Sequence, residues 1–224
     1  MHTARGYGQR VDDIARCTNH PTLGILIRRF LYEQLNPDSL ESATTIDVSV
    51  CPPFSSKLKV FHSAVAIYFS PSDISGIGGM HRQRIRATPQ WRLSGAPRYD
   101  CIFVEKDSTL PGMRGLLTAQ VLLFFSFSYC SITYPCALVQ WFQPVGGAPC
   151  LDTGLWVVEP ELDRHGRRVQ SVIHLDCILS AAHLIGVAGT HFIPRDLKYT
   201  HSLSAFKAFY VNKYANHHMH EIAF

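Results

Sequence analysis

The chain has 224 residues and a formal net charge of +4, with 46% hydrophobic and only 17% charged residues. A charged fraction below the usual quarter excludes a disordered tail and predicts a sizeable buried core, and the length suits one large domain or two small ones. The mild basic excess permits a nucleic-acid partner without requiring one. The seven cysteines are scattered and none forms a CxxC pair, which argues against a disulfide framework or a zinc ribbon and favours reduced thiols in a nuclear or cytoplasmic protein.

The N-terminal residues are polar and contain no apolar stretch of the kind that a signal peptide requires, so we expect a flexible N-terminus over 1–19. Apolar residues then recur three and four positions apart, at Leu23, Ile27, Phe30 and Leu31. This spacing predicts a helix over 20–35, which ends before Asn36-Pro37. A connector rich in Ser, Pro and Thr follows, and Leu58–Phe69 is typical of a strand, or of a strand followed by a short turn. The region 20–97 is expected to combine this helical segment, the connector and a basic, glycine-rich stretch.

The glycine-rich stretch is Gly76-Ile77-Gly78-Gly79. It resembles half of a phosphate-binding loop, but the chain contains neither GxxxxGK[ST] nor GxGxxG in a strand–helix unit. The simpler interpretation is a turn that requires positive φ.

A run of basic residues follows these glycines. Arg82, Arg84 and Arg86 share one face if the segment is a strand, whereas only Arg82 and Arg86 share one if it is a helix. Guanidinium groups suit phosphates, and a neighbouring tryptophan can stack on a base. The candidate nucleic-acid-binding residues are therefore His81, Arg82, Arg84, Arg86, Trp91, Arg92 and Arg98. The competing interpretation is a solvated face, or internal partners for Asp73, Asp100 or Glu105.

The second half of the chain carries five apolar or alternating segments separated by turn signals such as Pro111-Gly112 and His165-Gly166. They predict strands at 99–105, 116–129, 133–143, 154–159 and 168–175, and together an antiparallel, barrel-like domain over 98–224. The stretch Leu175–Val187 fits either a helix or a strand. Ser202–Asn216 has apolar residues at helical spacing and predicts an amphipathic helix that closes the domain.

No charged residue occurs between Arg114 and Asp152, so a membrane segment over 116–142 must be considered. Polar residues interrupt the run, and the odd positions from 119 to 129 are apolar. This period of two favours a buried hairpin, and we expect no membrane contact.

Other side chains could serve chemistry, but each has a structural interpretation. Trp141 and Trp156 are expected to pack in the core, with an aromatic pocket for a peptide or a methylated lysine as the alternative. The histidines at 217, 218 and 220 could hold a metal ion, yet a chain end is more often frayed. The scattered carboxylates could support a metal-dependent nuclease, but no nucleophile elbow and no acidic motif is present. We therefore expect no catalytic residues, no metal, no cofactor and no small-molecule substrate.

Several segments together resemble the region downstream of the catalytic domain in fungal Plavaka-type transposon proteins, which are related to the CACTA superfamily. These segments include HPTLGILIRRFLYEQL, FHSAVAIYFSPSDISGIGGMHRQRIRATPQWR, VLLFFSFSY, DTGLWVVEPE and VIHLDCILSAAHLIGVAG, and the likeness covers roughly residues 20–224. In that family the catalytic RNase H-like domain lies upstream, so the resemblance implies no catalytic residue here. The strand pattern is also similar to small BAH-type chromatin barrels, although a shared fold does not establish a function.

The sequence thus predicts an α+β chain in which a helical N-terminal segment precedes a β-rich, barrel-like antiparallel domain closed by a C-terminal helix. The expected function is that of a non-catalytic accessory module of a transposon-derived protein that binds nucleic acid or chromatin. The alternative is a protein–protein module that assembles a transposase, self-associates or docks on histone tails.

Overall fold

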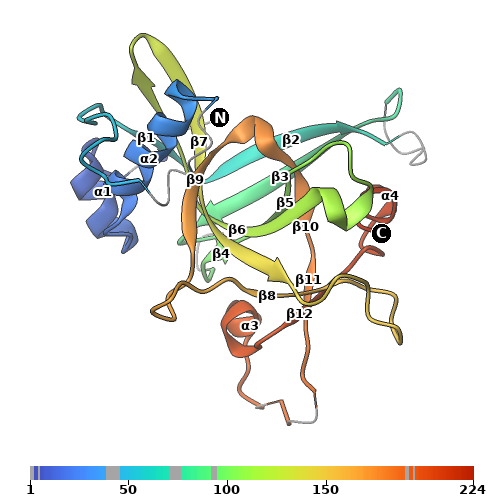
Figure 1. The fold of residues 1–224 in the computed structure, drawn as a ribbon. Helices are drawn as coiled ribbons and strands as arrows, with labels where there is room; N and C mark the ends of the chain where they lie inside the picture. Colours follow the sequence, from blue (N-terminus) through green and yellow to red (C-terminus); the bar gives the residue numbers. More distant parts are fainter. Residues whose placement is uncertain are drawn as a thin grey trace.

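The computed structural model describes residues 3–4, 6–38, 46–70, 77–91, 95–189, 192–193 and 195–224. The predicted fold class is confirmed: the chain is β-rich α+β, with a nearly closed antiparallel, barrel-like sheet and helices near both ends. Figure 1 shows the N-terminal helices on one side of the sheet and the C-terminal helix on the other. The helices are α1 (Val11–Thr18), α2 (Leu23–Leu35), α3 (Ser202–Ala205) and α4 (His217–Ile222), with short 3-10 turns η1 (Gly112–Gly115), η2 (Leu175–Cys177) and η3 (Tyr199–His201).

The larger sheet has the strand order β10-β5-β6-β7-β8-β12-β11, with β1 added to β6 and β9 added to β7. Its strands are β1 (Lys59–Phe61), β5 (Cys101–Glu105), β6 (Leu116–Tyr129), β7 (Ile132–Pro144), β8 (Val157–Pro160), β9 (Gln170–His174), β10 (Ile178–Ala182), β11 (Leu184–Gly186) and β12 (Phe209–Val211). A smaller sheet contains β2 (Ser63–Phe69), β3 (Met80–Thr88) and β4 (Arg98–Tyr99). All five strands expected between 99 and 175 are present within a few residues of their predicted bounds.

The hairpin of β6 and β7 is the centre of the fold, and α1 and α2 cover its outer end. Phe30 of α2 packs edge-on against Phe127 and Tyr134, with ring centroids 6.3 and 5.9 Å apart. Arg28 holds the connector that follows α2 against this helix, because its guanidinium donates to the carbonyl oxygens of Val48, Cys51 and Pro52. The helical segment therefore shares one apolar core with the hairpin.

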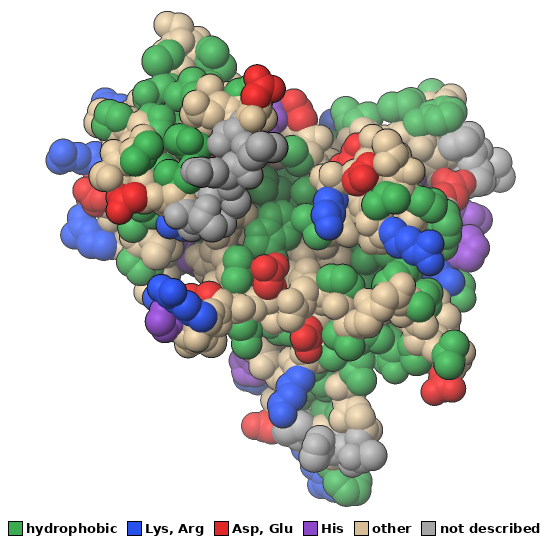
Figure 2. Space-filling model, in the orientation of Figure 1, with side chains coloured by type: hydrophobic (Ala, Val, Ile, Leu, Met, Phe, Trp, Pro, Cys, Tyr) green, Lys and Arg blue, Asp and Glu red, His purple; other side chains and the backbone are tan. Residues whose placement is uncertain are grey.

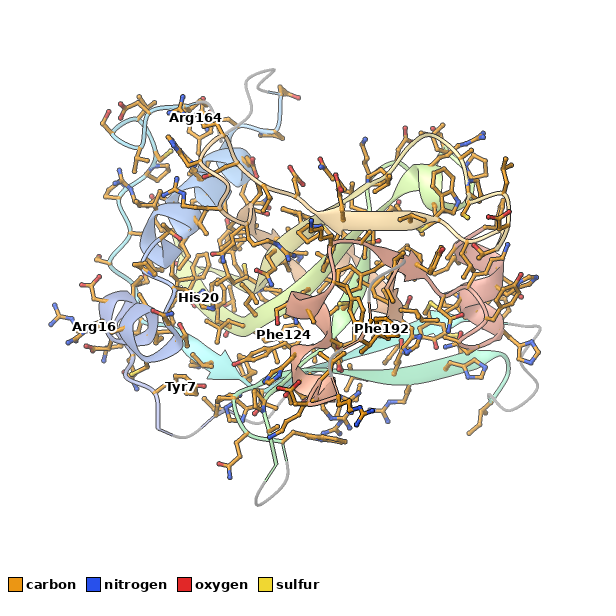
Figure 3. All side chains as sticks on the ribbon, turned by 90° about the horizontal axis from the view of Figure 1, so that it is seen from below. Tyr7, Arg16, His20, Phe124, Arg164 and Phe192 are labelled. Atoms are coloured by element: carbon orange, nitrogen blue, oxygen red, sulfur yellow. The ribbon has the colours of Figure 1, made fainter. Side chains whose placement is uncertain are left out.

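A β-bulge between Val121 and Leu123 changes which side of β6 faces this core. Before the bulge, Val121 packs toward β2 and β3; after it, Leu123 and Phe125 pack toward the helices. Phe124, labelled in Figure 3, lies in the interior between β6 and the β2–β3 pair. One strand thus serves the helix-covered core and the core beneath β2 and β3.

A third core lies at the opposite end of the hairpin, where β8, β11, β12 and α4 gather around Phe142 and Phe209. Trp156 and Met219 complete it. The helix predicted over Ser202–Asn216 is wrong: α3 ends at Ala205, and Phe209–Val211 form β12 between β8 and β11. Phe209 and Val211 are buried while Tyr210 is not, so the local pattern also has a period of two, and strand pairing selects it.

The ambiguous stretch 175–187 is extended, since β10 pairs with β5 and β11 pairs with β12. The first 19 residues, expected to be flexible, contain α1, whose Ile14 is fully buried in the core shared with Leu58 and Phe125. The expected division of the chain into segments at residues 19 and 97 stays a prediction, although the core around Ile14 contains residues from both sides of each boundary. Among the described residues, no helix is long and apolar enough to span a membrane.

Candidate nucleic-acid interface

The basic run forms β3, so its arginines alternate across a strand. Arg82, Arg84 and Arg86 lie on one face, and they sit opposite Ile67, Val65 and Ser63 of β2 in the antiparallel register. Arg82 and Arg84 are exposed, whereas Arg86 is half-buried. The other face of β3 carries Ile85 and Ala87 into the core against β6. One side of the strand is therefore anchored, and the arginine side points outward.

Hydrophobic residues share the outward face of this two-stranded ribbon with the arginines. Val65, Ile67 and Phe69 of β2 are 38%, 61% and 59% exposed, and Met80 of β3 is 46% exposed. Figure 1 shows the outer ends of β2 and β3 projecting past the larger sheet, next to α4. The ribbon thus offers a cationic stripe beside an apolar stripe. On the face drawn in Figure 2, by contrast, Lys and Arg side chains are spread out rather than gathered.

Two glycines of the glycine-rich stretch lie in the turn that leads into β3. Gly78 and Gly79 have φ of 60° and 76°, a region that favours glycine, as the sequence predicted for this turn. A Cβ on Gly79 would also lie 2.7 Å from Cε2 of Phe69. These glycines therefore form the turn that leads into β3, and the absence of a side chain at Gly79 leaves room for the Phe69 ring. Gly76 lies outside the described residues.

Arg98 has an internal partner. Its Nε donates to Asp100 Oδ1 at 2.7 Å, and its guanidinium lies 4.5 Å from the centre of the Trp91 ring. Arg86 approaches the same ring at 5.6 Å, and its backbone N–H donates to Asp100 Oδ2. Arg98 also lines a cavity of about 320 Å³ together with Arg84. For Arg98, the internal-partner interpretation raised by the sequence therefore holds.

His81 lies on the opposite side of β3 from the arginines. Its ring stacks on Tyr68 at 6.0 Å, and Tyr68 stacks in turn on His218 of α4 at 4.0 Å. Burial is the main cause of a lowered pKa at His218, while Glu221 raises that pKa and His81 lowers it. The structure thus separates His81 from the predicted phosphate contacts and places it against the C-terminal helix. Arg92 lies outside the described residues.

The structure does not bring Trp141 and Trp156 together in one pocket. The indole N–H of Trp141 donates to Ser171 Oγ at 2.7 Å, and its ring packs against the core beneath β2 and β3. Trp156 is 6% exposed in the core near α4, and its N–H donates to the carbonyl oxygen of Phe224. Each indole therefore has a separate packing role and a separate hydrogen bond.

The other candidate groups are dispersed. In the part of the chain that the structure describes, no three His, Cys, Asp or Glu side chains lie close enough to hold a metal ion. The histidines near the C-terminus belong to α4, which is not frayed: Asn216 caps it by accepting from the Met219 N–H, and Met219 is buried. Asp73, one of the carboxylates considered above, lies outside the described residues.

Sequence reasoning missed the apolar half of the ribbon face. Val65, Ile67 and Phe69 alternate along β2, and this alternation was the available signal. Ala64 is buried and Ala66 is half-buried, so two small residues face inward while Val65, Ile67 and Phe69 face solvent. The outward face of β2 therefore exposes three large apolar side chains side by side.

Comparison of the chain with known protein families, with characterised proteins and with solved structures found no match.

Proposed function

We propose that the chain is a non-catalytic accessory module of a transposon-derived protein, and that it binds nucleic acid through the outward face of β2 and β3. The observation that carries the proposal is the pair Arg82 and Arg84. Both are exposed on one face of β3, and neither has an ion-pair partner among the residues described. The transposon origin rests on the ordered segments that resemble Plavaka-type proteins.

The shape of the ribbon supports a nucleic-acid partner. A two-stranded antiparallel ribbon is one of the two elements that the major groove of B-DNA admits. Arginines along such a ribbon can bond phosphates on either side, and an exposed aromatic ring such as Phe69 can stack on an unpaired base. The ribbon supplies both kinds of contact on one surface.

The experiment is fluorescence anisotropy with a labelled 20-base-pair duplex and a 20-nucleotide single strand, each at two salt concentrations. The variant R82A/R84A should bind about 10-fold more weakly, and its slope of log affinity against log salt should be shallower by ~1–2. The matched control R16A/R164A removes the same charge from exposed positions that Figure 3 places away from β2 and β3. Equal losses of DNA affinity in the two double variants would contradict the assignment of the site to β2 and β3.

The apolar stripe favours a second candidate, a protein partner or a second copy of the chain that docks on Val65, Ile67 and Phe69. Such contacts are not screened by salt. The variant V65T/I67T should then weaken self-association in sedimentation experiments at high salt, while R82A/R84A should leave it unchanged. DNA binding without salt-resistant self-association would favour the first candidate.

A further inference from the structure

A cavity of about 830 Å³ lies between the β6–β7 hairpin, β8 and α3, away from the ribbon face. This volume falls within the range of roughly 300–1,000 Å³ that small-molecule sites occupy. Leu203 and Phe206 give it an apolar wall, and most of its other lining residues are polar, among them Gln120, Gln140, Glu159, Arg168 and Lys207. An apolar wall beside polar groups that can orient a ligand is the usual chemistry of a ligand site.

The hairpin after β8 brings Arg168 to this cavity. Leu162 and Arg168 face each other across an isolated bridge, and the Val169 N–H donates to the Glu161 carbonyl oxygen at 2.9 Å. At the tip, the Asp163 carboxylate accepts from Arg167 Nε and from the backbone N–H groups of Arg167 and His165. Arg167 is therefore neutralised at the turn, and Arg168 is directed inward.

Arg168 is a half-buried cation, and no carboxylate pairs with it in the described ranges. Its Nη2 donates to the Trp141 carbonyl oxygen at 3.3 Å, and its guanidinium lies 4.6 Å from the centre of the Phe142 ring. Its Nε is buried and has no hydrogen-bond partner. Burial also lowers the pKa of this guanidinium, as expected for a charge with reduced solvation. A half-buried charge in this position is stabilised when an anion binds beside it.

The remaining polar groups limit the charge of that anion. Gln140 donates to Gln120 at 2.6 Å, so the polar side chains between β6 and β7 bond each other and are neutral. Glu159 accepts from Gln143 and adds one negative charge, while Lys207 adds a second positive charge. The cavity thus holds two cations and one anion. This balance suits a ligand with a single negative charge better than a doubly charged phosphate.

We propose that this cavity binds a small molecule that carries one carboxylate on an apolar body. The carboxylate pairs with the guanidinium of Arg168, whose planar fork matches its two oxygens, and the apolar body packs against Leu203 and Phe206. This site is independent of the ribbon, and it departs from the expectation that the chain has no small-molecule ligand.

The test is a titration of the full ¹⁵N-labelled chain with octanoate and, separately, with 1-octanol, followed by NMR. Octanoate should bind ~10-fold more tightly than octanol, because a charge-assisted hydrogen bond adds to the same apolar contact. R168M should remove that difference and leave octanol binding unchanged. R164M, which removes an exposed arginine of the same hairpin, should behave as the wild type.

A second variant covers the case in which R168M does not fold. Ser204 is an exposed residue of α3 that lines the cavity, so S204W should fill the space and weaken binding of both probes at least ~10-fold. Absence of octanoate binding, equal affinity for the two probes, or unchanged binding by S204W would each overturn the proposal.

Discussion

The guanidinium of Arg98 lies 4.5 Å from the centre of the Trp91 ring while its Nε donates to Asp100. Arg98 is therefore held on two sides, and it belongs to the framework that joins β3 to β5, unlike the exposed Arg82 and Arg84. The basic run thus contains two kinds of arginine with different expected effects on stability and on binding.

The first prediction compares these two kinds. R98M removes the cation from Asp100, whose side chain is 15% exposed, and should lower the free energy of unfolding by about 1 kcal/mol, a value reduced for the partial exposure of Arg98. R82M removes an exposed arginine from the same sheet and should change stability by less than about 0.5 kcal/mol. Urea unfolding of both variants provides the comparison. Equal effects would mean that the Arg98–Asp100 pair does not stabilise the fold.

The second prediction concerns acid. Burial lowers the pKa of His218 below its ordinary value of 6.5, so the unfolded chain binds more protons than the folded chain as the pH falls below that value. The stability that the neutral imidazole contributes is complete above about pH 6.5 and is lost progressively as the pH falls toward the lowered folded pKa. His20 and His62 act in the same direction, because burial lowers their pKa values too.

The measurement is the free energy of unfolding at pH 7.5 and pH 5.0 for the wild type and for H218N. Loss of the stacking on Tyr68 should weaken the variant at both pH values. The difference between the two pH values should nevertheless be smaller in H218N. A pH difference equal to that of the wild type would show that His218 does not titrate across folding.

The third prediction concerns a close contact at the end of β11. A Cβ added to Gly186 would lie 2.2 Å from Cδ2 of Phe206, a ring that packs edge-on against Phe209. G186A should therefore displace Phe206 and destabilise the fold by roughly 1–3 kcal/mol. Gly147 has no atom within 4 Å of its Cβ position, so G147A is the matched control and should be nearly neutral. Thermal unfolding of the two variants decides the matter; a neutral G186A would contradict this packing.

The fourth prediction concerns the thiols. Burial raises the pKa of Cys101 to about 12 and also raises the pKa of Cys136, and Cys51 is 2% exposed. These three should resist iodoacetamide in the native chain and react in urea. Cys150 should react first, because hydrogen bonds from Thr153 lower its pKa. Mass spectrometry of the alkylated peptides gives the order, and early labelling of Cys101 would contradict its burial.

The sequence was sufficient to predict the strands whose pattern is local. β6 and β7 carry long alternating or apolar runs joined by a two-residue turn, and both bounds of β6 matched the prediction. The alternation of Arg82, Arg84 and Arg86 was also visible as one of two possibilities. Formation of β3 settled which one applies, since its pairing with β2 fixes the face that the arginines occupy.

Long-range contacts decided the rest. Phe206 and Phe209 fit a helical period. Phe209–Val211 nevertheless form β12 between β8 and β11, because the backbone pairing with both strands outweighs the local helix propensity. Arg168 was treated as part of a strand, and its position beside a cavity depends on α3, which is about 30 residues away in the chain. No pattern within a short window contains that relationship.

The bulge at Leu122 has a consequence for how this chain can change its length over evolution. Leu122 has no partner across the hairpin, because Val121 pairs with Val139 and Leu123 pairs with the next residue of β7, Leu138. Deletion of Leu122 would make these two pairs consecutive and restore regular alternation, so Leu123 and Phe125 would still face the helices and Phe124 would still lie beneath β2 and β3. Leu122 is therefore a position at which β6 can lose one residue while every other residue keeps its partner and its side, and we expect single deletions to be tolerated there and at the turn near Cys130 and Ser131.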